Sequence, residues 1–202
     1  MSALYEWKVF CQWIREQGED SLPEHVSLSE LNRFSVRYRL ADSFEGLILN
    51  GYADETEAAY SALMKAFLAY SALEQFDKAV KSIPSVHRTE RWAKLATGPA
   101  AELRKAEEVV DFLASQMDRE SSRKRVIAFR DGDTDNCLIM AAALRHAVAH
   151  GFMSVHPEGS SAKRATTFCQ QVSQMLMMIC RQAFSDFVQE LPKYANLERA
   201  VV

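Results

Sequence analysis

One arginine and two histidines lie close together on an apolar stretch of the chain, as Arg145, His146 and His150 in the segment ALRHAVAHGF. A guanidinium stays protonated and presents a planar set of donors to phosphate oxygens. An imidazole exchanges protons near neutral pH, and the C-terminal end of a helix favours its charged form. A fixed cation beside a proton-transfer group suits cleavage of a phosphodiester that carries its own 2′-hydroxyl nucleophile. These residues therefore predict chemistry on RNA without a metal or another cofactor.

The same residues are compatible with simpler interpretations. Arg145 and His150 would also serve as a salt bridge and a cap at a helix C-terminus, and His146 as a hydrogen-bonded core histidine. The i, i+4 spacing of the two histidines, with His156 as a third ligand, suits zinc, although the glutamate of an H-E-x-x-H motif is missing. Glu74 would be either a buried partner that orients Arg145 or an edge residue in water.

Helical geometry sets a condition on this site. A helix over residues 136–150, ended by Gly151, is expected to be buried because it is apolar almost all around. Arg145 and His150 are separated by about 140° on an ideal helix. Their side chains are therefore expected to converge only where the helix unwinds near Ala149, or where two copies of it meet in a dimer.

The elements that must hold this site are also predicted to be helical. The chain of 202 residues contains few glycines and prolines and many good helix formers, and it shows no alternating strand. We predict an all-α, up-and-down bundle of five to seven helices with mostly antiparallel neighbours, in a single domain over residues 1–202. The predicted helices cover residues 4–16, 29–42, 56–82, 90–95, 99–117, 136–150 and 161–190. Their predicted start and stop signals are Ser29, Pro99, Thr134 or Asp135, Ser161 and Pro192.

The most charged segment, DRESSRKRVIAFRDGDTDN, shows the weakest periodicity and is predicted to be a loop or a broken helix. Arg123, Lys124 and Arg125 within it are candidate ligands for RNA phosphates, although such a run is also typical of a solvated face. The DGDTDN part has Asn136 and Ala142 where an EF-hand loop requires Gly and Glu, so we interpret it as a helix cap.

Composition limits the classes of protein that remain. The formal net charge is −3, so binding of nucleic acid must depend on a local basic patch. The four cysteines form no CxxC pair and lie in apolar helical stretches, which predicts reduced, structural thiols. The N-terminal residues lack the pattern of a signal peptide, and no apolar run is long enough to span a bilayer. A cytoplasmic protein without a membrane partner is therefore expected.

The segment RHAVAHG resembles the R-x(4–6)-H motif of the HEPN (higher eukaryotes and prokaryotes nucleotide-binding) superfamily. The resemblance covers residues from Thr56 onward, and it predicts a HEPN-like core at residues 56–192 with an N-terminal helical extension at residues 1–50. It implies that Arg145 and His150 are the catalytic residues of a metal-independent endoribonuclease, and that His146 is the supporting polar residue.

The same resemblance has implications for partners. Members of this superfamily are often homodimers whose two motifs face one cleft, and they include toxins with protein antitoxins and anti-phage ribonucleases. RNA, a second copy of the chain and an antitoxin protein are therefore the expected partners. Non-catalytic relatives make a nucleotide-binding or protein-interaction module the alternative.

Overall fold

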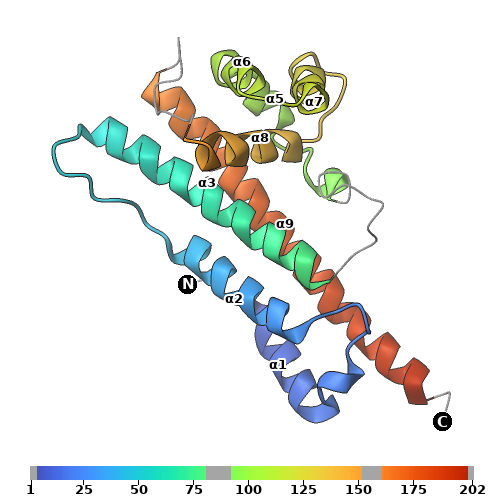
Figure 1. The fold of residues 1–202 in the computed structure, drawn as a ribbon. Helices are drawn as coiled ribbons and strands as arrows, with labels where there is room; N and C mark the ends of the chain where they lie inside the picture. The colour runs from blue at the N-terminus through green and yellow to red at the C-terminus, as the bar shows by residue number, and fades with distance from the viewer. Residues whose placement is uncertain (1–3, 81–91, 152–160, 200–202) are drawn as a thin grey trace.

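The computed structural model describes residues 4–80, 92–151 and 161–199, without the side chains of Tyr5 and of residues 192–199 (Figure 1). Every regular element in these ranges is a helix, which confirms the predicted all-α bundle. The α-helices are α1 (Tyr5–Gln17), α2 (Leu28–Ser43), α3 (Asp54–Ala79), α5 (Ala100–Arg104), α6 (Glu107–Ser115), α7 (Glu120–Arg130), α8 (Leu138–Ala149) and α9 (Ala162–Arg199), with 3-10 turns at Glu19–Ser21 and Ala93–Leu95. Within the described residues, no helix has the length and apolar character needed to cross a bilayer.

The two longest helices, α3 and α9, lie side by side and run in the same direction (Figure 1). Their first turns meet where Ala59 packs against Ala162, and their later turns meet where Phe76 approaches Phe184. Short connections predict antiparallel neighbours, whereas here α5 to α8 return the chain to the beginning of α3 before α9 starts. Helix α2 runs antiparallel to both, because its first turn lies beside the last residue of α3, Ala79.

An aromatic cluster joins the N-terminal helices to this framework. The ring of Phe184 in α9 lies 5.5 Å from Trp7 and 5.9 Å from Phe10 in α1, and 5.6 Å from Phe34 in α2. The ring of Phe76 in α3 lies 4.9 Å from that of Phe34. Each phenylalanine in this cluster is at most 1% exposed, and burial of such a side chain contributes about 1.5–3 kcal/mol. Helices α1 and α2 therefore belong to the same core as α3 and α9.

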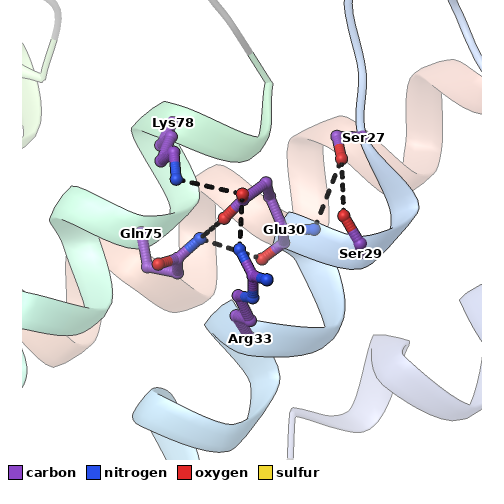
Figure 2. A network of polar contacts seen from close by, with 6 residues as sticks. All are labelled: Ser27, Ser29, Glu30, Arg33, Gln75 and Lys78. Atoms are coloured by element: carbon purple, nitrogen blue, oxygen red, sulfur yellow. Dashed lines mark hydrogen bonds and ion pairs between the residues drawn. The ribbon is translucent and has the colours of Figure 1, made fainter.

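A network around Glu30 connects the beginning of α2 to the end of α3 (Figure 2). The Ser27 hydroxyl accepts a hydrogen bond from the Glu30 backbone N–H at 3.4 Å, so Ser27, rather than the predicted Ser29, caps α2. The Glu30 carboxylate accepts a hydrogen bond from Gln75 and pairs with Lys78 at 3.0 Å. These contacts complement the packing between the two helices.

Several predicted boundaries are wrong for identifiable reasons. The segment predicted as a loop or broken helix forms α7, because Val126 and Phe129 provide a short buried stripe that the surrounding charges obscure. The helix predicted over residues 99–117 is interrupted between Arg104 and Glu107, which gives α5 and α6. Pro192 does not end the last helix, since α9 continues to Arg199. A proline removes one hydrogen bond, and a long, well-packed helix can continue past it.

The cysteines that the sequence predicts to be structural include three buried thiols. Cys137, Cys169 and Cys180 are buried and unpaired, and Cys11 is partly exposed. Burial raises the pKa of Cys137 and of Cys169 to about 12, which keeps both thiols protonated and unreactive at neutral pH.

Candidate functional site

Helix α8 forms the floor of the candidate site. It packs against α3, α6 and α7, and most of its residues are buried, as its apolar sequence predicts. The helix begins two residues later than predicted: the Asn136 side chain accepts a hydrogen bond from the Leu138 N–H at 3.2 Å, and the Thr134 hydroxyl accepts one from the Asn136 N–H at 3.2 Å. Asp135, the other predicted cap, pairs with Arg104 at 2.7 Å instead.

The C-terminal end of α8 positions His150. The helix ends at Ala149, and His150 is the C-cap residue, whose backbone N–H donates to the His146 carbonyl at 3.1 Å. Gly151 follows in the left-handed region at a φ of 71°, a conformation that favours glycine. The predicted stop at Gly151 is therefore correct, and it leaves the His150 imidazole exposed at the end of the helix.

A cavity of about 700 Å³ lies between α3, α7 and α8, and Arg145, His146 and His150 all line it. The residues of α8 on its wall also include Ala142 and Ala143. Their short side chains leave space along the arc of α8 between Arg145 and His150. Arg145 and His150 thus line one cavity within a single chain, and the helix ends at Ala149, between the two residues. The expectation that a second copy brings the two side chains together stays a prediction.

Arg145 is held from α3. Its Nε atom lies 3.8 Å from Glu74 Oε2, and the two side chains are 42% and 28% exposed. The distance between the two charged groups is long and both side chains are partly exposed, so Glu74 orients the guanidinium without burying it. Of the two interpretations of Glu74, this ion pair agrees with a partner of Arg145, although Glu74 is half-buried rather than buried.

The two imidazoles differ in their surroundings. The His146 and His150 rings are in contact, with their centroids 4.3 Å apart and their planes tilted by 48°. His146 Nε2 is buried and has no hydrogen-bond partner among the described residues, and its nearest carboxylate oxygen, Asp118 Oδ2, lies 3.7 Å away. His146 thus lies against the His150 ring, and His150 is the more accessible imidazole.

Helix α7 brings only one of the three cations that the sequence singles out to the cavity. Of Arg123, Lys124 and Arg125, only Arg125 lines the cavity. Arg123 donates to the Met117 carbonyl at 3.0 Å, and Lys124 lies 3.7 Å from Glu120 on the outer surface.

Several further residues form the same wall, and of these Arg119 belongs to the basic stretch that the sequence proposes as a site for RNA phosphates. Arg119, the N-cap residue of α7, and Ser122 line the cavity beside Arg125, because side chains three residues apart are neighbours on a helix surface. A helical assignment for this segment would have found that spacing. Asp77 and Asp118 also line the cavity, and together with Glu74 they balance the formal charge of its three arginines. Cationic groups on α7 and α8 therefore face carboxylates from α3 and from the turn before α7.

The metal interpretation gains no geometric support from this arrangement. Among the described residues, no group of three His, Cys, Asp or Glu side chains is placed to hold a metal ion. His156, the third ligand of the alternative zinc site, lies outside the described residues.

Comparisons with protein-family models, curated protein sequences and solved structures gave no match to this chain. The geometry of the cavity and the motif that lines it are therefore the features that bear on the function of this chain.

Proposed function

We propose that this protein is a metal-independent endoribonuclease of the HEPN type. The observation that carries the proposal is that Arg145, His146 and His150 line one cavity, into which α7 also brings Arg119 and Arg125. Guanidinium groups bind phosphate oxygens in the bidentate geometry that planar donors allow. The substrate is single-stranded RNA, which can enter the open cavity with its bases unstacked.

The proposed reaction is an internal transfer of the phosphoryl group. The 2′-oxygen attacks phosphorus, the bond to the 5′-oxygen breaks, and the products are a 2′,3′-cyclic phosphate and a 5′-hydroxyl. One proton leaves the 2′-hydroxyl and one reaches the 5′-oxygen, and His150 performs one of these transfers as general base or general acid. Arg145 stabilises the negative charge that develops on the non-bridging oxygens. The second proton is exchanged with water, or with His150 of a second copy in the homodimer that the motif implies.

His146 is proposed as a positioning residue. Its ring contacts that of His150 in a tilted arrangement, and its buried Nε2 lies 3.7 Å from Asp118 Oδ2. These contacts support a role in orienting the His150 imidazole, rather than in a second proton transfer.

The deciding experiment is RNA cleavage in the presence of EDTA. Wild-type protein should convert an RNA oligonucleotide to fragments with cyclic phosphate ends, and Arg145→Ala or His150→Ala should lower the rate at least about a hundredfold. Lys105→Ala is the matched control, since Lys105 is an exposed cation that does not line the cavity. Full activity in both site variants, or activity that EDTA abolishes, would refute the proposal.

A nucleotide-binding module is the second candidate, and one observation favours it. The cavity volume lies within the range of small-molecule pockets, and its carboxylates offset its arginines. Isothermal titration with mononucleotides distinguishes the two functions, because binding without any RNA cleavage supports the module.

The resemblance to HEPN proteins extends the proposal to a biological role as a toxin, countered by an antitoxin protein, or as an anti-phage effector. Production of the wild-type protein in bacteria should then arrest growth, whereas production of His150→Ala to the same level should not.

A further inference from the structure

The exposed face of α3 connects the candidate site to α2. In Figure 1, α3 runs between α8 and α2. Glu74 of α3 pairs with Arg145 of α8 at 3.8 Å. One turn earlier, the Ser71 hydroxyl accepts a hydrogen bond from Arg37 of α2 at 3.1 Å. One turn later, Lys78 forms an ion pair with α2. Residues three and four apart share a helix face, so the contacts with α8 and with α2 adjoin one another on α3.

Glu30 holds two of the cations on this side of the molecule (Figure 2). Its Oε1 atom lies 2.7 Å from Arg33 Nη1 and 3.0 Å from Lys78 Nζ, while Gln75 binds its other oxygen. The Glu30 side chain is 14% exposed, whereas those of Arg33 and Lys78 are each 62% exposed. One largely buried carboxylate therefore fixes two solvent-facing cations, which keep further donors for a ligand.

We infer that Arg33, Arg37 and Lys78, here called the α2–α3 basic edge, bind backbone phosphates of the RNA strand that is cleaved at Arg145. This inference rests on the proposed function. Charge complementarity supports it, since Arg33 and Lys78 share the single carboxylate of Glu30, and Glu74 beside them is paired with Arg145, on a chain whose net charge is −3. Exposed guanidinium and ammonium groups without an aromatic platform suit phosphates rather than bases.

The position of the edge sets which nucleotides it binds. Lys78 lies one helical turn from Glu74, a rise of about 6 Å along α3. The edge therefore holds phosphates beyond the one that is cleaved, and a dinucleotide, whose single phosphate is the one cleaved, offers the edge no phosphate. Substrate length should thus decide how much the edge contributes to binding, while the rate of the chemical step on bound substrate stays the same.

The test measures binding and cleavage with short and long RNA. The variant Arg33→Gln/Arg37→Gln/Lys78→Gln should bind a labelled oligouridine of about 20 nucleotides roughly tenfold to a hundredfold more weakly, measured by fluorescence anisotropy in a His150→Ala background that prevents cleavage. The slope of log K against log[salt] should decrease in magnitude by about 2, as expected when the protein no longer neutralises three phosphates of a single strand. With His150 intact, the same triple variant should cleave the dinucleotide UpU at the wild-type rate.

Two control variants separate phosphate binding from a purely structural role. Lys105→Gln/Lys163→Gln/Arg164→Gln removes the same charge from a separate groove between α5 and α9, and should leave the salt slope unchanged. Glu30→Gln disrupts the same network but keeps its cations, so it should lower the melting temperature without weakening RNA binding. If the triple edge variant and Glu30→Gln lost RNA binding in proportion to their loss of stability, the inference would be overturned.

The inference and the proposed function can fail separately. Wild-type cleavage of UpU together with an unchanged affinity of the edge variant for the long RNA overturns the inference and leaves the nuclease standing. Salt-dependent binding that requires the edge, without cleavage of either RNA, supports the edge and refutes the nuclease.

Discussion

At the scale of single residues, the proposed mechanism assigns the fixed positive charge to Arg145 and the proton transfer to His150. Arg145 is partly exposed and lies 3.8 Å from Glu74, a pair of the kind that contributes about 1 kcal/mol or less to stability. Its guanidinium can therefore be changed with little effect on the fold. His150 lies at the helix end, where its imidazole is exposed and contacts the ring of His146.

Arg145→Lys should retain binding of RNA but lose most of its cleavage. A lysine keeps the charge and loses the planar pair of donors that holds two phosphate oxygens at once. We expect single-turnover cleavage to fall about 10²- to 10³-fold, with a melting temperature within about 4 °C of the wild type. A lysine variant with wild-type cleavage would show that a point charge is sufficient there.

Substitution by phenylalanine distinguishes the two histidines. His146→Phe keeps an aromatic ring against His150 and removes a nitrogen that makes no hydrogen bond among the described residues, so cleavage should stay within about tenfold of the wild type. His150→Phe keeps a ring but cannot transfer a proton, and its cleavage should fall by at least about a hundredfold. Equal losses in both variants would assign a proton-transfer role to His146 as well. Rates across a pH series provide the measurement.

At the scale of elements, α7 shows how one helix divides its cations between two faces. Positions 119 and 125 face the cavity, whereas Arg123 and Lys124 point to a backbone carbonyl and to the outer surface. Only knowledge that the segment is helical assigns each charge to a face.

The two faces of α7 predict unequal effects on RNA binding. Arg119→Gln/Arg125→Gln should reduce the magnitude of the salt slope for single-stranded RNA by about 1.4, in keeping with two phosphates that the protein no longer neutralises. Arg123→Gln/Lys124→Gln removes the same formal charge and should change the slope much less. This arrangement of the site would be contradicted if the second pair of substitutions had the larger effect.

The contact between α2 and α3 predicts a stability that depends on pH. Hydrogen bonds from Lys78 and Gln75 lower the pKa of Glu30. Its stabilising contribution is complete above the ordinary glutamate pKa of about 4.3, and it is lost as the pH falls through the lowered value of the folded state.

Glu30→Gln should therefore be less stable than the wild type at neutral pH and should lose less stability on acidification below about pH 4.3. Urea denaturation at a series of pH values measures both effects. If the free-energy difference between the two proteins did not change with pH, Glu30 would not be the group responsible.

At the scale of the whole molecule, the aromatic cluster around Phe184 joins four helices. Phe184 is fully buried and lies against rings from α1, α2 and α3. The N-terminal helices therefore cover the part of α9 and α3 that would otherwise expose large apolar side chains.

Phe184→Ala should destabilise the protein by about 3–5 kcal/mol, because it leaves a cavity where four helices meet. For a chain of this length, that loss corresponds to a fall in melting temperature of roughly 10 °C or more. Met178→Ala on the same helix is the control: its side chain is 50% exposed, so its cost should be below about 1 kcal/mol. Calorimetry on both variants shows whether the cluster makes the expected contribution to the free energy of unfolding.

The sequence alone determined the helical class and the chemistry available on α8. Breaker content and apolar periodicity are local properties, so they predicted α1, α2, α3, α8 and the beginning of α9 within a few residues. Arg145, His146 and His150 were found in the same way, because their spacing and the glycine that ends the helix are adjacent in the chain.

Only the tertiary structure decided what surrounds those residues. The wall formed by Arg119, Ser122 and Arg125, and the placement of Glu74 beside Arg145, come from helices far apart in sequence. The parallel course of α3 and α9 also depends on contacts between helices far apart in sequence. Such contacts depend on which buried faces pack together, and a local pattern of residues contains no information about its distant partner.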